Sequence, residues 1–209
     1  MQVIDSIFYV IVLIMSVVVH EFAHGYVAYR FGDNTARMQG RLTLNPIKHL
    51  DLFGSILLPL SLILFHAGFV LGWAKPVPYN PHNLRKEKLH SIFVALAGIA
   101  ANLFLAIIFG LLIRVFSHYG FNSLNFISFY KIATSIVLVN IVLAIFNIVP
   151  IPPLDGSKIL FGLLPARFFR IERFLEQWGM FVLLFFIITL WQYFSPVIFF
   201  LFKLFTGVN

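Results

Sequence analysis

The stretch that decides the fold is IFYVIVLIMSVVVHEFAH, Ile7 to His24. Its apolar run is interrupted only by Ser16 before it ends in the motif HEFAH. On a helix, His20 and His24 lie one turn apart on one face, close enough to bind the same metal ion. Glu21 is then placed to accept a proton from a water at that metal. Such groups are costly at the end of a membrane span, so we expect them to have a function rather than to be merely interfacial.

The composition is that of a polytopic membrane protein. The 209 residues are 60% hydrophobic and 11% charged, with a mean hydropathy of +0.94. Because no polar block is long enough to fold outside a bilayer, we expect one membrane-embedded domain, residues 1–209. The chain has no cysteine, which excludes disulfides and thiolate metal sites, so any metal must have nitrogen and oxygen ligands.

The net charge of +7 does not indicate a nucleic-acid partner. Most of the basic residues lie in short loops between apolar runs, where anionic lipid is the usual partner. The N-terminus also lacks the basic region of a cleavable signal peptide, and its apolar run leads directly into HEFAH.

Five apolar segments are each near or above the roughly 20 residues that cross the hydrocarbon. The expected fold is therefore all-α, with about four to six transmembrane or re-entrant helices. Pro196 leaves the last segment open to one kinked helix or a span followed by a short interfacial piece. The segments cover residues 5–29, 53–72, 90–117, 129–151 and 177–205.

The distribution of lysine and arginine orients these segments. The connections 30–51, 73–89 and 152–176 are basic, whereas 118–130 has no lysine or arginine. Basic connections normally face the cytoplasm, so HEFAH is expected at the cytoplasmic end of the first span. Because segment 53–72 has basic flanks on both sides, we expect it to be re-entrant or strongly bent, with a plain crossing as the alternative.

A hydrolytic zinc site has three protein ligands and one open position, so a third ligand is needed. Asp155 is the candidate, because it follows an apolar segment in the rigid turn PIPPLDG, residues 150–156. Its alternative role is to cap a helix that starts near Ser157. The other acidic residues after His24 lie in connections where a solvated charge is expected: Asp33, Asp51, Glu87, Glu172 and Glu176.

The remaining histidines are weaker candidates. His66, in an apolar segment, is a possible ligand, and His49 is expected to be structural. The three expected at the membrane interface are His82, His90 and His118.

HEFAH in a first apolar span, followed late in the chain by FNIVPIPPLDG, resembles the site-2 protease family of intramembrane zinc metalloproteases. GRLTLNPIKHLDLFGS and GWAKPVPYNP are similar to segments of compact bacterial members without a PDZ domain. The resemblance implies one zinc ion held by His20, His24 and Asp155, with Glu21 as the catalytic acid and base.

The resemblance also assigns polar residues near the metal. Asn147 matches an asparagine that is implied to contact the substrate or the developing oxyanion, with a bond inside the helix bundle as the alternative. The run AGIAAN, residues 97–102, resembles a core-helix element in which Ile99 replaces the usual proline. There Gly98 is expected to allow close packing, and Asn102 either faces the site or is structural.

The implied reaction is hydrolysis of a peptide bond in or near the membrane span of a single-span protein, at the cytoplasmic side of a bacterial inner membrane. Met38–Leu44 resembles a small membrane-associated β element whose edge strand would hold an extended substrate. Two other functions stay open: a metal-binding transporter that uses the same ligands, and a catalytically inactive relative that binds membrane helices.

Overall fold

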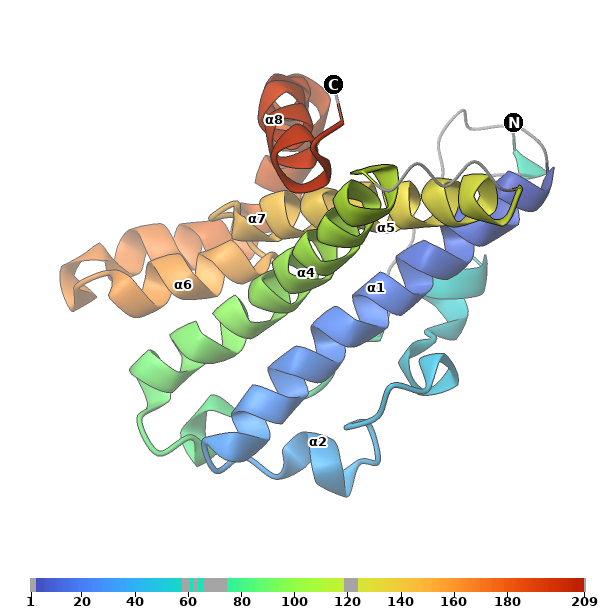
Figure 1. Cartoon of the computed structure of the whole chain (residues 1–209). Coiled ribbons are helices and arrows are strands. Elements are labelled where there is room, and N and C mark those ends of the chain that lie inside the picture. The colour runs from blue at the N-terminus through green and yellow to red at the C-terminus, as the bar shows by residue number, and fades with distance from the viewer. Residues whose placement is uncertain (1–2, 58–60, 62–63, 66–74, 119–123, 209) are drawn as a thin grey trace.

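The chain is helical throughout most of its length, as expected where an apolar backbone must satisfy its own hydrogen bonds. The computed structural model describes residues 3–57, 61, 64–65, 75–118 and 124–208 (Figure 1). Its α-helices are α1 (Val3–Arg30), α2 (Thr35–Met38), α4 (Glu87–His118), α5 (Leu124–Ile148), α6 (Asp155–Leu163), α7 (Phe169–Thr189) and α8 (Ser195–Thr206). Short 3₁₀ or π turns lie at Pro46–His49, Leu52–Leu57, Pro81–Asn83, Ala166–Phe168 and Trp191–Phe194.

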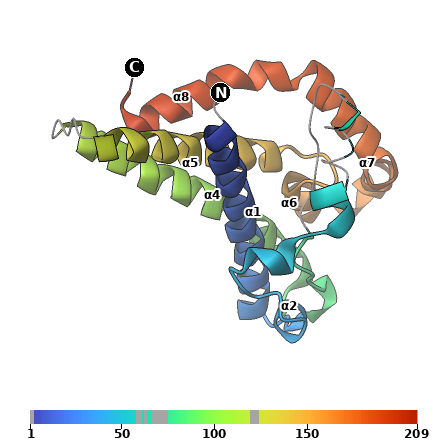
Figure 2. The same cartoon turned by 90° about the vertical axis from the view of Figure 1, so that its right-hand side faces the viewer.

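Three helices in the described residues are long and apolar enough to cross a membrane. They are Phe8–Arg30, Glu87–His118 and Ile127–Ile148, and they match three of the predicted segments. A fourth candidate is the pair formed by α7 and by Trp191–Thr206, which is bent by 63° (Figure 2). The chain therefore has the helices of an integral membrane protein, and its last apolar segment is two helices rather than one.

Helix α4 is the centre of the bundle and packs against α1, α5, α6 and α8. Its buried residues recur every three or four positions and are mostly small or polar, which lets neighbouring helices approach closely. At Gly110, for example, an added methyl group would lie 2.7 Å from Cβ of Phe205 on α8. The buried stripe comprises His90, Val94, Gly98, Asn102, Ala106, Gly110 and Ile113.

The small β element predicted at Met38–Leu44 is wrong. Met38 ends helix α2, a turn follows through Gly40 at φ +63°, and residues 41–45 form no strand. A strand needs a ladder partner for its backbone groups, and the part of the chain described here contains no second strand for GRLTL to join. Met38 is instead 85% exposed at the end of its helix.

The prediction for segment 53–72 concerns residues that lie largely outside the described part of the chain. The described beginning is a helical turn, Leu52–Leu57, whose start is fixed by the Asp51 carboxylate accepting the Gly54 N–H at 2.7 Å. Whether the segment re-enters stays a prediction, and His66 also lies outside the described residues.

Candidate metal centre

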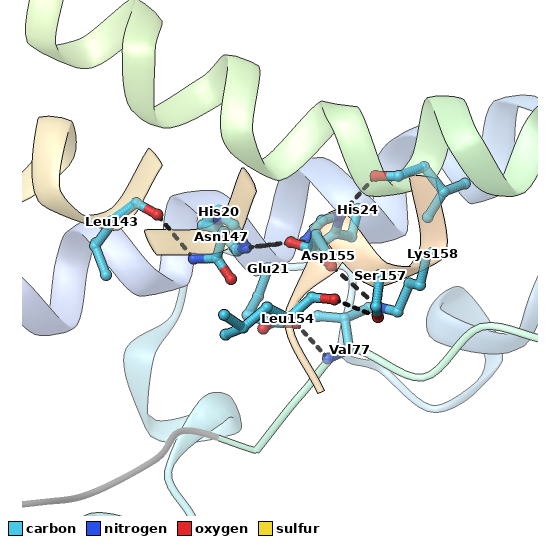
Figure 3. A network of polar contacts seen from close by, with 11 residues as sticks. His20, Glu21, His24, Val77, Leu143, Asn147, Leu154, Asp155, Ser157 and Lys158 are labelled. Atoms are coloured by element: carbon cyan, nitrogen blue, oxygen red, sulfur yellow. Dashed lines mark hydrogen bonds and ion pairs between the residues drawn. The ribbon is translucent and has the colours of Figure 1, made fainter. Parts of the chain in front are cut away.

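The ends of two distant helices bring the predicted ligands together. His20 and His24 lie on one face of the C-terminal half of α1, and Asp155 is the first residue of α6 (Figure 3). The turn before Asp155 is held by Val149 and Leu154, which are buried against Leu183 and Phe186 of α7. The rigid turn thus delivers a carboxylate to a histidine that lies 135 residues earlier in the chain.

Each of the three side chains contributes one atom to a small triangle. Oδ2 of Asp155 lies 3.0 Å from Nε2 of His20 and 2.9 Å from Nε2 of His24, and the two Nε2 atoms are 2.9 Å apart. All three residues are buried, with 5–6% of their surface exposed. The N-cap of α6 is Leu154 and Asp155 is the first residue inside the helix, so Asp155 is not the cap of a helix that starts near Ser157.

These atoms fit a small divalent cation. Nδ1 of His24 donates to the Val94 carbonyl at 2.6 Å, which leaves a lone pair on Nε2. In the neutral imidazole this lone pair faces a carboxylate oxygen at 2.9 Å, and the two repel each other unless a proton or a metal cation lies between them. In a tetrahedral zinc site with bonds of about 2.0–2.1 Å, donor atoms are about 3.3 Å apart, so the observed triangle needs to widen only slightly.

Helix α4 closes one side of this centre through Gly98. A methyl group added at Gly98 would lie 2.5 Å from Cε1 and Nε2 of His24 and 2.6 Å from Cε1 of His20. The sequence indicated close packing at Gly98, but not that its partners are the two imidazoles. The absence of a side chain here is what allows α4 to press both rings toward Asp155.

A lysine that the sequence analysis did not single out completes the carboxylate's surroundings. Nζ of Lys158 lies 3.1 Å from Oδ1 of Asp155 and 5.6 Å from the centre of the Tyr79 ring. Burial lowers the pKa of Lys158, but the Asp155 charge raises it by more, so Lys158 stays charged. Oδ1 is thereby occupied and Oδ2 faces the histidines. The available signal was the Asp–Lys spacing of three on one helix.

Glu21 points to the other side of the centre, toward the segment before α4. Its Oε2 accepts the backbone N–H of Val77 at 2.8 Å (Figure 3). Because the donor is a main-chain group, no side-chain pattern could have identified it. The bond fixes one oxygen of the carboxylate and leaves the other for chemistry.

The two predicted asparagines have different surroundings. Nδ2 of Asn147 donates to the Leu143 carbonyl at 2.9 Å, and the side chain is half-buried beside the centre (Figure 3). Asn102 is 0% exposed, and neither of its side-chain polar atoms has a hydrogen-bond partner among the described residues. Asn147 is therefore the more accessible of the two.

The other described histidines lie outside the centre. Nε2 of His49 is 2.8 Å from the Thr43 carbonyl, a bond that ties its turn together. His82 is exposed beside Glu87, and His90 is buried with its ring stacked on Phe31 at 4.0 Å. His118 ends α4.

Comparison with known proteins gives one family and several relatives. The model of peptidase family M50 matches residues 8–124 and 117–190. YwhC of Bacillus subtilis strain 168 is 47% identical over 161 residues, which are 75% of this chain and 68% of that protein. Rip2 of Mycolicibacterium smegmatis is 33% identical over 202 residues, 94% of this chain and 73% of that protein. Both are named as candidate zinc metalloproteases. No solved structure gives a significant match.

Proposed function

The chain belongs to peptidase family M50, the site-2 protease family, and is a metalloprotease; we propose that it uses one zinc ion to hydrolyse a peptide bond in or next to a membrane span of another protein. The observation that carries this proposal is the convergence of His20, His24 and Asp155 within one cation's reach. Bound zinc would supply Lewis-acid chemistry that makes water a nucleophile near neutral pH.

Glu21 is the residue we assign to proton transfer. It follows the first ligand directly, and the Val77 N–H holds its Oε2 in place. Its carboxylate accepts the proton of the attacking water and later delivers it to the leaving nitrogen of the peptide. Both transfers use the same oxygen, because the other is engaged.

Asn147 is the residue we assign to the substrate carbonyl. An amide nitrogen has two hydrogens, and one of them is used by Leu143, so the second is left to donate to developing negative charge. Asn102 remains a weaker candidate for this role, because a substrate can reach it only if α4 moves.

The setting of the site supports our proposals for the substrate class and for the side of the membrane. The centre lies among apolar helices, so the substrate we propose is a membrane protein with a single, apolar span. The basic residues Arg30 and Lys86 lie at the same end of α1 and α4 as the centre, which supports a cytoplasmic-facing site in a bacterial inner membrane.

The test uses Glu21→Gln in the full-length chain. The probe is a set of quenched fluorescent peptides with about 20 apolar residues, in which a helix-breaking Gly-Pro pair is moved stepwise along the span. We expect wild type to cleave part of the set, and Glu21→Gln to retain one zinc per chain and cleave none.

The matched control is Glu176→Gln, which removes an exposed carboxylate on α7. It should cleave like wild type. Turnover by Glu21→Gln at the wild-type rate would remove Glu21 from the mechanism, whereas a wild-type chain that binds no zinc would remove the metal centre.

A further inference from the structure

Asp33 is a buried carboxylate that the mechanism above does not use. It lies just beyond the end of α1 and is only 1% exposed. The chain reaches this position through Gly32 at φ +113°, a backbone conformation that a residue with a side chain rarely adopts. A buried carboxylate normally accepts hydrogen bonds at both of its oxygens. The donors that Asp33 contacts therefore identify the segments that it connects.

The two oxygens of Asp33 face different parts of the chain. Oδ1 accepts from the backbone N–H of Thr35 at 3.1 Å, from its hydroxyl at 2.5 Å and from Nδ2 of Asn83 at 2.9 Å. Oδ2 accepts from the backbone N–H of Asn80 at 2.7 Å. The carboxylate therefore joins the end of α1 to the segment that precedes α4.

The segment that Asp33 contacts at Asn80 also contacts Glu21, at Val77. Val77 is 5% exposed, and its N–H donates to Glu21 as described above. Its side chain lies directly on α1, since a methyl group added at Gly25 would be 2.6 Å from Cγ1 of Val77. A further bond runs from Arg41 to the Pro76 carbonyl at 3.0 Å.

Proline makes this short segment stiff. Between Pro76 and Pro81 the sequence is Val-Pro-Tyr-Asn, so three of six residues have a fixed φ. The residues that precede each proline are also restricted to extended conformations. Of the three backbone N–H groups that remain, Val77 donates to Glu21 and Asn80 donates to Asp33.

We propose that Asp33 is a positioning residue for Glu21: it anchors the stiff segment 76–81 at Asn80, and the segment in turn presents the Val77 N–H that orients the proton-transferring carboxylate. This inference rests on the proposed role of Glu21. It assigns Asp33 no contact with the substrate or the metal. Loosening the anchor should let the Glu21 side chain leave the geometry needed for proton transfer.

Asp33→Asn breaks the anchor selectively. An amide has one oxygen, which can keep the three donors at the Oδ1 position, and its NH₂ then faces the N–H of Asn80. The hydrogen bonds from residue 33 to Thr35 and Asn83 are then kept, while its hydrogen bond to the backbone of Asn80 is lost. Asn83→Ala is a milder variant that keeps the carboxylate and removes one of its donors.

The first test is amide hydrogen exchange, which does not depend on activity. A proteolytic fragment spanning residues 76–81 reports on only Val77, Tyr79 and Asn80, because the other residues are proline. We expect Asp33→Asn to speed exchange at both Asn80 and Val77 at least tenfold, Asn83→Ala to do so less, and Glu21→Ala to affect Val77 alone. Unchanged protection of Val77 in a folded Asp33→Asn chain would overturn the inference.

The second test is a double-mutant cycle on the quenched peptide that wild type cleaves fastest. Val77→Pro deletes the N–H that Glu21 accepts, and Val77→Ala is its reference because it keeps that N–H. Asp33→Asn and Val77→Pro should each lower kcat about tenfold to a hundredfold, with KM within about twofold and zinc content unchanged.

If Asp33 acts through the Val77 N–H, the double variant should be no slower than the slower single variant. Losses that multiply, or a loss in KM alone, would mean that Asp33 acts by another route and would overturn the inference. If wild type cleaves none of the peptides, the proposed substrate class fails, and the exchange experiment alone decides on Asp33.

Discussion

Replacing Gly98 by alanine should weaken metal binding without changing any of the proposed ligands. The new methyl group would lie 2.5 Å from two atoms of His24 and 2.6 Å from one atom of His20. Carbon atoms in contact prefer about 3.5–4.0 Å, so the rings or α4 must move by about 1 Å. Ligand distances in metal sites tolerate only about 0.2 Å, so we expect zinc affinity to fall at least about 100-fold, or about 2.7 kcal/mol.

The matched control is Gly110→Ala on the same helix. There the added methyl group would lie 2.7 Å from Cβ of Phe205, so the packing is disturbed to a similar degree. The site is about 18 Å further along α4, away from the histidines. Both variants should lose thermal stability, but only Gly98→Ala should lose zinc affinity.

Zinc affinity is measured on the purified full-length chain by competition with a chromophoric chelator, alongside zinc content and the midpoint of thermal unfolding. Wild-type affinity in a folded Gly98→Ala chain would refute the argument that α4 presses the imidazoles together. An equal loss of affinity in Gly110→Ala would also refute it, since the effect would then be one of general packing.

Three further predictions concern the charged groups. Lys158→Met should weaken zinc binding about tenfold, because Oδ1 of Asp155 loses its partner; the chelator competition measures this, and unchanged affinity would contradict it. Chelation should lower the unfolding midpoint of wild type but not of Asp155→Ala, because only wild type gains stability from bound zinc. Burial raises the pKa of Asp33, but its hydrogen bonds from Asn83, Thr35 and the backbone lower it by more. Its stabilising effect is therefore full above about pH 5 and is lost as the pH falls below about 4, so the difference in unfolding midpoint between wild type and Asp33→Asn should shrink there. A difference independent of pH would contradict this.

The sequence identified the candidate metal ligands because each lies in a short, local pattern. His20 and His24 are fixed relative to each other by helical geometry alone. Asp155 stood out among the acids because prolines and a glycine surround it, and a rigid turn can place a side chain without knowledge of the rest of the fold. Local geometry was therefore enough to identify the candidates, though not to show that they meet.

The features that the sequence analysis missed depend on contacts between distant segments. The Val77 N–H carries no side-chain signal, and the partners of Gly98 are set by how closely α4 approaches α1. The β element failed because the alternation in GRLTL is equally compatible with an irregular loop when no second strand is present in the described residues. Pro196 left open one kinked helix or two pieces, and it lies in the first turn of α8, where proline is favoured.

The long separation between the ligands along the chain has a consequence for biosynthesis. Ribosomes make proteins at about 5–20 residues per second, so the aspartate follows the first histidine after about 7–27 seconds. Throughout that interval the nascent chain already has its first candidate span and Glu21, but lacks Asp155 and the turn that carries it. On the proposed mechanism, incompletely synthesised molecules are therefore inert, and the membrane is exposed to hydrolytic activity only after Asp155 has been made.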